Sequence, residues 1–303
     1  MKNLSPIVLF VYNRPWHTQQ TIEALQKNEL AGESNFIIYS DEARNKDEQE
    51  NVDKVRLYIN QINKFKKVTI IKRETNWGLA NNIVDGVTKV VNQYGKIIVL
   101  EDDLVTSPYF LKYMNEALDF YKDEGKVWHI SGWNYPIETD ELDDVFLYRA
   151  MNCWGWATWN DRWKYYERNA DKMIKNFSNE DIKKFNLNHA EDFFNQIILN
   201  KKKKINTWAI FWYATLFKKN GLCLNPAQTF LENIGLDSSG TSPGNNMFKN
   251  YDNISLIKKI NFINDISENQ IAVNRIINFF KDNNNKSIFE RIVNNIKRKF
   301  GLN

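Results

Sequence analysis

The sequence predicts an α/β protein with a mixed, mostly parallel central sheet flanked by helices. Short apolar runs dominated by β-branched residues alternate with segments of helical periodicity, a pattern typical of buried parallel strands joined by helices. Four such runs precede residue 103, at residues 6–12, 36–39, 68–71 and 97–100. Charged residues follow several of the runs directly, as expected where the carboxyl ends of strands meet at a ligand site.

The helical segments place apolar residues on one face. The first follows Asn13-Arg14-Pro15 and turns Ile22 and Leu25 inward, and a later helix opens at Pro108. The inward residues of the second, third and fourth helices are Val52, Val55, Tyr58, Ile59 and Ile62, then Leu79, Ile83, Val87 and Val90, then Phe110, Leu111, Met114, Leu118 and Tyr121. A short apolar strand then runs from Trp128 into a loop at Asn134.

Three carboxylates, Glu101, Asp102 and Asp103, close the fourth apolar run. Adjacent carboxylates repel one another unless a cation lies among them, and their oxygens suit a hard divalent metal such as Mg²⁺ or Mn²⁺. Such a metal suits a diphosphate. Arg14 and Asp41 follow the first and second runs, so the fold should bring them to the same edge as the acids. For the triplet alone, an acidic turn that caps the next helix is the alternative.

Composition sets broader limits. The chain has 303 residues, enough for a substantial core, and its net charge of +4 does not indicate a nucleic-acid binder. Cys153 and Cys223 cannot form a disulfide framework, which fits a reducing compartment. Residues 1–6 lack the apolar core of a signal peptide, and no segment approaches the roughly 18 apolar residues of a spanning helix. We therefore expect a soluble, cytoplasmic protein.

Tryptophan is concentrated between residues 153 and 163. Trp156, Trp159 and Trp163 have the i, i+3, i+7 spacing of one helix face, which favours a helix facing the core. Tryptophan rings beside a polar cleft can also bind the C–H surface of a sugar. Trp154 and Trp156 flank Gly155, where the backbone can approach a ligand, so they are the better candidates for sugar contact.

Residues 96–134 resemble the metal-binding core of GT-A fold glycosyltransferases. The shared features are a strand ending in Glu-Asp-Asp-Leu, a helix beginning near Pro-x-Phe, and a strand ending in Ser-x-Trp-Asn. The nearest resemblance is to the family of the animal Golgi β-1,2-N-acetylglucosaminyltransferase that initiates complex N-glycans, and to bacterial family-2-type sugar transferases. It covers roughly residues 6 to 245, including Tyr12-Asn13-Arg14, the segment 76–80 and Cys153-Trp154-Gly155-Trp156.

The resemblance implies a role for each acid of the triplet. Asp103 would bind the Mn²⁺ or Mg²⁺ that bridges the donor diphosphate. Asp102 would approach the ribose, and Glu101 the hydroxyl groups of the donor sugar. These roles are physically coherent, because a metal at this point would neutralise charge as the nucleoside diphosphate leaves.

The resemblance also implies donor contacts outside the triplet. Arg14 would lie beside the phosphates of the donor, and Trp77 would be one of the residues that bind the donor. Asp41 would accept a hydrogen bond from the base, which favours uracil. The alternative for Asp41 is a helix N-cap ahead of Asp47-Glu48-Gln49. On the acceptor side we expect four tryptophans: Trp133, Trp154, Trp156 and Trp208.

The general base is where this chain departs from the Golgi enzyme. That enzyme carries a Trp-Asp-Asp-Trp element, whereas this chain has Trp208-Ala209-Ile210-Phe211-Trp212 without a carboxylate. An inverting transfer needs a base within reach of the acceptor hydroxyl. An insertion at about 164–206 contains Glu191-Asp192 before an apolar helix. In other inverting transferases an acidic pair at a helix start often supplies the base, so the resemblance makes Asp192 the first candidate. Asp237 is the second, and either acid could equally be a helix cap or a solvated loop residue.

Two further segments suggest accessory roles. Residues 225–244 are rich in Gly, Ser and Pro and predict a loop, which the resemblance identifies with a lid over the donor, with a plain solvent loop as the alternative. Residues 286–300 predict a basic amphipathic helix that could lie on an anionic membrane or pack on the domain or another subunit. The run 201–204 of four lysines predicts a solvated turn, with contact with lipid as the minor alternative.

These observations together divide the chain into a donor-binding half at 1–135, an acceptor-binding half at 136–253, and a C-terminal helical appendage at 254–303. The expected activity is metal-dependent, inverting transfer from a UDP-sugar to a glycan or lipid-linked glycan, in bacterial surface polysaccharide or lipopolysaccharide synthesis. A carbohydrate-binding protein without catalysis is the alternative. The sequence argues against a second alternative, a sugar-phosphate nucleotidylyltransferase. Such an enzyme should carry a glycine-rich phosphate loop after the first strand, where this chain has Tyr12-Asn13-Arg14-Pro15.

Overall fold

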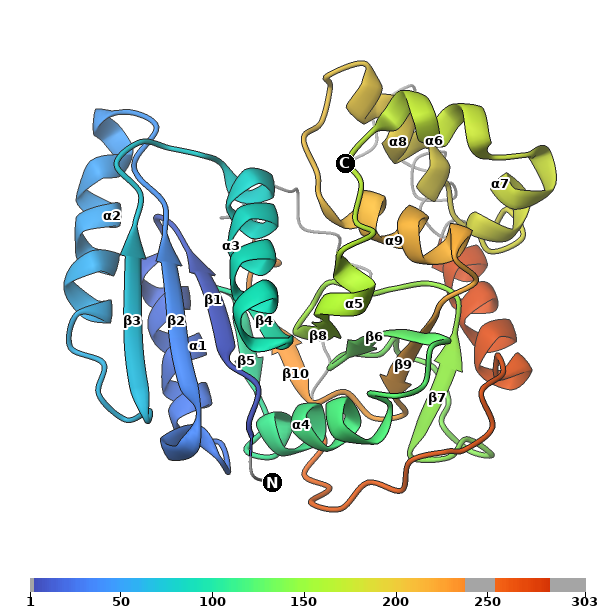
Figure 1. Cartoon of the computed structure of the whole chain (residues 1–303), viewed down its shortest axis with the longest axis horizontal. Helices are drawn as coiled ribbons and strands as arrows, with labels where there is room; N and C mark the ends of the chain where they lie inside the picture. The colour runs from blue at the N-terminus through green and yellow to red at the C-terminus, as the bar shows by residue number, and fades with distance from the viewer. Residues whose placement is uncertain (1–2, 238–253, 284–303) are drawn as a thin grey trace, which may run out of the picture.

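The structure is a computed structural model that describes residues 3–237 and 254–283 (Figure 1). Its elements alternate between strands and helices through β4 and become less regular afterwards. In chain order they are β1 (Ile7–Val11), α1 (Pro15–Gln26), η1 (Ala31–Glu33), β2 (Asn35–Ser40), α2 (Lys46–Ile59), β3 (Lys67–Lys72), α3 (Leu79–Tyr94), β4 (Lys96–Glu101), β5 (Leu104–Thr106), α4 (Phe110–Phe120), β6 (Val127–Ser131), β7 (Val145–Tyr148), β8 (Trp156–Trp159), α5 (Asn160–Trp163), α6 (Ala170–Asn176), α7 (Asn179–Phe185), α8 (Phe193–Lys201), α9 (Ala209–Lys218), β9 (Leu222–Pro226) and β10 (Leu231–Asn233).

Eight strands form one sheet in the order β3-β2-β1-β4-β8-β6-β9-β7. The pairs within β3-β2-β1-β4 are parallel, and so is β6 with β9, whereas β8 runs antiparallel to both β4 and β6 and β7 runs antiparallel to β9. The first four strands coincide with the four apolar runs, because buried parallel strands need apolar residues on both faces. The prediction of a mixed, mostly parallel sheet flanked by helices is confirmed.

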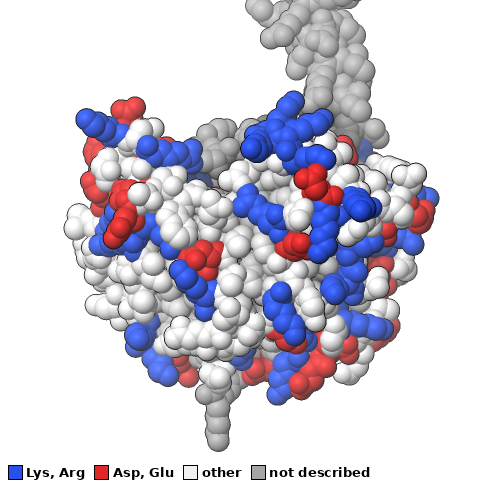
Figure 2. All heavy atoms as spheres, turned by 45° about the horizontal axis from the view of Figure 1, so that its top comes forward, with Lys and Arg blue, Asp and Glu red and all other residues white. Residues whose placement is uncertain are grey.

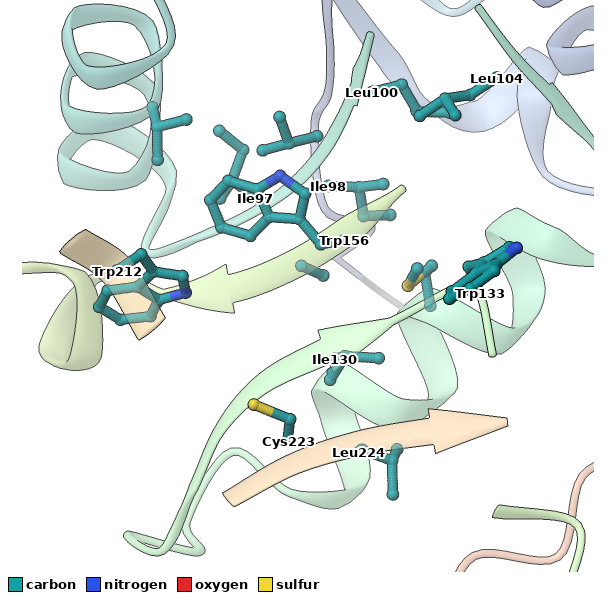
Figure 3. Packing of buried hydrophobic residues seen from close by; sticks show 14 of the residues in the cluster. Ile97, Ile98, Leu100, Leu104, Ile130, Trp133, Trp156, Trp212, Cys223 and Leu224 are labelled. Atoms are coloured by element: carbon teal, nitrogen blue, oxygen red, sulfur yellow. The ribbon is translucent and has the colours of Figure 1, made fainter. Parts of the chain in front are cut away.

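The tryptophan segment differs from its predicted form. Trp156–Trp159 is strand β8, inserted between β4 and β6, and only Asn160–Trp163 is helical. The predicted helix through all three tryptophans is therefore wrong. A central strand buries side chains on both faces, so it does not show the alternation that would have distinguished it from a helix. Figure 3 shows the ring of Trp156 close to Ile97 in the core.

Residues 254–283 pack on the sheet domain. The backbone N–H of Ser255 donates to Thr229 O over 2.7 Å, and Arg149 pairs with Glu268. A helix over residues 270–283 buries Ala272 and Ile276 completely. The basic amphipathic helix expected at 286–300, and the part of the expected lid beyond residue 237, lie outside the described residues. Among the described helices, none has both the length and the apolar character needed to cross a membrane.

Candidate functional site

The strand ends gather the charged residues at one edge of the sheet. In the parallel register Phe10 of β1 lies opposite Glu101 of β4, and Val11 lies opposite Ser40 of β2. The residues that follow these strands therefore emerge side by side. Arg14 Nη1 donates to Asp103 Oδ2 over 2.8 Å, and the backbone N–H of Tyr12 donates to Asp102 Oδ2 over 3.3 Å. The predicted convergence of the first strand end and the acidic triplet is thus present.

Arg14 is the most informative side chain of this edge. Its guanidinium pairs with Asp103 and lies 3.7 Å from Asp102 Oδ1. Its Nε and Nη2 atoms are buried and have no hydrogen-bond partner among the described residues. Buried polar groups are nearly always paired, because an unpaired donor loses its hydration without compensation. Two nitrogen atoms that lack a hydrogen-bond partner on one buried cation are therefore suited to an anion.

The acids are crowded enough to change their protonation. Burial, and then the charges of Asp103 and Asp102, raise the pKa of Glu101 to about 8. Burial and the charge of Asp103 raise the pKa of Asp102 to about 7. Both shifts indicate that negative charge is disfavoured here, which a cation would relieve.

No group of three or more His, Cys, Asp or Glu side chains within residues 3–237 and 254–283 could hold a metal ion. Asp103 would therefore be joined in a metal site mainly by oxygens of the substrate. This fits Mg²⁺ or Mn²⁺, which are commonly bound through one or two carboxylates together with substrate phosphates. The residues present are thus compatible with a metal-diphosphate complex.

A returning segment of the chain lies directly on this ion pair. Strand β10 pairs antiparallel with β5, and the next residue, Ile234, donates its backbone N–H to Asp103 O over 2.9 Å. Gly235 follows at such close range that a Cβ atom there would lie 2.1 Å from Asp103 Oδ2 and 2.7 Å from Arg14 Nη2. Only glycine fits this position without moving the pair.

Asp237 is brought to the site by the same segment. Its Oδ2 lies 3.1 Å from His17 Nε2, and its Oδ1 lies 3.9 Å from Arg14 Nη2. The side chain of Asp237 is still 46% exposed. Sequence reasoning missed His17, although its position in the first turn of α1, three residues after Arg14, could have placed it here. It also missed Trp16, which is 57% exposed with its ring against that of His17.

Asp41 lies at the end of β2 and holds a neighbouring loop. Its carboxylate accepts hydrogen bonds from the backbone N–H groups of Trp77 and Gly78, each over 2.9 Å. The N-cap of α2 is Asn45, so the alternative that Asp41 caps this helix is wrong. Trp77 is partly exposed, with the Arg73 guanidinium 3.8 Å above its ring.

The tryptophans expected on the acceptor side are divided by burial. Trp133, Trp156 and Trp208 are at most 3% exposed, and the rings of the last two stack at 5.1 Å. These three are core residues in this structure, so their ring faces are not open to a sugar. Trp154 alone of the four keeps part of its surface open, with its ring 4.6 Å from that of Trp133.

The two candidate bases lie in different surroundings. Asp192 is the exposed N-cap residue of α8, where its side chain accepts a hydrogen bond from Asn186 over 3.2 Å but makes no capping hydrogen bond to the helix. In the described residues no hydrogen bond or ion pair links Asp192 to Arg14 or the acidic triplet. Its neighbour Glu191 is partly buried, and burial raises the pKa of Glu191.

Several solved structures are similar to this chain at low identity. S. aureus TarS matches 42% of this chain with 15% identity and a TM-score of 0.30, and S. aureus TarS 1-349 matches 75% with 11% identity and a TM-score of 0.41. This chain spans 21% and 59% of those two chains. The mannosyltransferase PcManGT from Pyrobaculum calidifontis, in complex with GDP-Man and Mn²⁺, matches 73% of this chain and 70% of its own, with 8% identity and a TM-score of 0.37.

Among curated proteins no significant match is found. The sequence model of the GNT-I family matches residues 1–174, which include the four parallel strands β3-β2-β1-β4, Arg14, Asp41 and the acidic triplet. The mixed, mostly parallel sheet flanked by helices agrees with the α/β architecture that the resemblance implied. On this match the chain belongs to the GNT-I family.

Proposed function

We propose that this chain transfers a sugar from a UDP-sugar to a hydroxyl group of a glycan, with a divalent metal bound at Asp103 and with inversion at the anomeric carbon. The observation that carries the proposal is the buried guanidinium of Arg14, whose Nε and Nη2 atoms lack a hydrogen-bond partner beside Asp103 at the carboxyl end of the sheet. A nucleoside diphosphate supplies the anionic oxygens that these groups and the crowded acids lack.

Each residue of the edge has a defined part in this proposal. Asp103 would hold Mn²⁺ or Mg²⁺, which when bound supplies Lewis-acid stabilisation of the leaving diphosphate. Arg14 donates to phosphate oxygens, and this interaction strengthens as charge develops on them. Asp102 and Glu101 face the ribose and the donor sugar, and Asp41 accepts from the uracil with the Trp77 loop fixed against it.

The transfer forms one bond to the anomeric carbon, breaks one there, and moves one proton. The acceptor oxygen attacks the anomeric carbon, the bond from that carbon to the phosphate oxygen breaks, and the hydroxyl proton passes to a carboxylate. Asp192 is our first candidate for that carboxylate and Asp237 the second. Asp192→Asn should then lower kcat by about 10²- to 10⁴-fold while leaving the Kd for UDP unchanged.

The acceptor we propose is a growing surface glycan such as lipopolysaccharide, capsule or a lipid-linked oligosaccharide, reached at the cytoplasmic face of a membrane. Exposed lysines at the end of α8, Lys201 to Lys204, support contact with an anionic surface. Figure 2 shows basic side chains grouped on the upper face of the molecule. Trp154, with part of its surface open, is the tryptophan we propose for acceptor contact, and 286–300 the segment for membrane contact.

Calorimetric binding of UDP, GDP and CMP, with and without Mn²⁺, tests the donor site. The proteins are the wild type, Asp103→Ala and, as a matched control, Asp119→Asn, which removes an exposed acid paired with Lys96. We expect manganese-dependent UDP binding that Asp103→Ala abolishes and Asp119→Asn retains. If the folded wild type binds no nucleotide under any condition, the transferase proposal fails and the carbohydrate-binding alternative takes its place.

A further inference from the structure

A carboxylate of the chain itself stands beside the unpaired face of Arg14. Asp237 Oδ1 is 3.9 Å from Arg14 Nη2, too far for a hydrogen bond but close enough for an ionic attraction. Its second oxygen, Oδ2, is 3.1 Å from His17 Nε2. One anion therefore spans two donors that come from the turn after β1 and the first turn of α1.

His17 is positioned to donate a hydrogen bond to an anion. The residue is only 7% exposed, and burial, followed by the charge of Arg14, lowers the pKa of the imidazole. The ring is therefore neutral near pH 7. An ionised carboxylate only accepts hydrogen bonds, so the proton of the neutral ring belongs on Nε2 in this contact. The same N–H would donate equally well to a phosphate oxygen.

Asp237 fills the pocket incompletely. With Asp237 in place, the Nε and Nη2 atoms of Arg14 are still buried without a hydrogen-bond partner, and the Asp237 side chain is nearly half exposed. A carboxylate has two oxygens in one plane, whereas a phosphate group presents three oxygens in a tetrahedral arrangement. A phosphate could bond to Nη2, Nε and His17 Nε2 together, and a carboxylate reaches only part of this set.

We propose that Arg14 and His17 form a pocket for a phosphate group of the donor, and that Asp237 stands in this pocket as an intramolecular anion which the phosphate must displace. This inference rests on the proposed function for the identity of the donor, and on the contacts of Asp237 for the displacement. It assigns His17 to donor binding and makes Asp237 a competitor of the donor.

The pocket can be tested without a nucleotide by calorimetric binding of inorganic diphosphate in the presence of Mg²⁺. Asp237→Asn keeps the shape of the side chain and removes its charge, and we expect it to bind diphosphate about tenfold more tightly than the wild type. In the Asp237→Asn background, His17→Ala should weaken binding about tenfold, and His17→Gln should restore part of the loss through its amide N–H. The matched control is Glu50→Gln, which removes an exposed acid paired with Lys54 and should bind like the wild type.

Several outcomes would overturn the inference. Equal or weaker diphosphate binding by Asp237→Asn would show that Asp237 does not compete with the anion. An equal gain in diphosphate affinity for Glu50→Gln would show that the gain comes from the change in net charge and not from the position of Asp237. A fall in kcat for Asp237→Asn with unchanged Kd values would assign Asp237 to proton transfer. The separate nucleotide series tests the proposed function. If the chain binds diphosphate as expected but binds no nucleotide, the phosphate pocket is supported and the proposal of a nucleotide-sugar donor fails.

Discussion

The charged edge of the sheet and the tryptophan cluster are the two most distinctive regions of this molecule. The first forms a candidate site at the strand ends, whereas most of the second is buried in the core. Arg14, Asp103 and Asp237 come from distant parts of the sequence and meet in contacts of 3.9 Å or less. Trp156 and Trp208, expected to meet a sugar, instead stack on one another inside the core. Chemistry-bearing residue types mark a site only where the topology also brings them to the open end of a strand.

The largest expected effect is on the charged edge. Asp103→Asn should reduce kcat/KM for sugar transfer by about a thousandfold or more, because it removes the carboxylate that holds the metal while preserving shape. Steady-state kinetics with a nucleotide-sugar and Mn²⁺ measure this, with circular dichroism to establish folding. Activity close to that of the wild type would show that the charged edge takes no part in catalysis, and the two regions would then no longer differ in function.

Trp156 should show the opposite behaviour. Trp156→Ala should reduce the free energy of unfolding by about 3–5 kcal/mol, since it opens a cavity in the middle of the sheet. Urea denaturation measures the loss, and Trp16→Ala, at an exposed tryptophan, should stay within about 0.5 kcal/mol of the wild type. A Trp156→Ala protein of normal stability with impaired acceptor binding would return this residue to the acceptor site.

Arg14 allows a finer test of the edge. Arg14→Lys keeps the positive charge but loses the planar set of N–H groups, so the Kd for UDP with Mn²⁺ should rise about 10- to 100-fold. The contrasting control is Arg44→Lys, at an exposed arginine above the Tyr12 ring, which should change the Kd little. Equal effects of the two substitutions would mean that Arg14 contributes charge alone.

The smallest effect concerns Glu101 and pH. Its folded pKa of about 8 exceeds the roughly 4.3 of an unfolded glutamate, so the folded state binds the extra proton between these values. The associated stability is fully present below the unfolded pKa and is lost as pH rises towards 8. In metal-free protein, Glu101→Gln should therefore flatten the fall of Tm over this window by a few degrees. An unchanged Tm profile would show that Glu101 is ionised throughout.

The sequence was informative wherever one physical constraint dominated. The four parallel strands follow from apolar runs, and the meeting of Arg14 with Asp103 follows from the order of those strands. The burial of Trp156 could not be predicted, because the same spacing fits a helix face and a strand followed by a turn. His17 and Asp237 meet across a separation of 220 residues, a contact set by the pairing of β10 with β5. No local pattern encodes that pairing.

Strand β5 is only three residues long, yet much depends on it. It begins directly after Asp103, pairs with β10, and leads to Ser107, whose hydroxyl donates to Ser255 O over 2.6 Å. Substitutions in Leu104–Thr106 would shift a candidate metal ligand and the segment above it together. A mutational screen that measures turnover alone would therefore not distinguish these structural positions from the reacting residues. It would wrongly assign strand β5 to the active site.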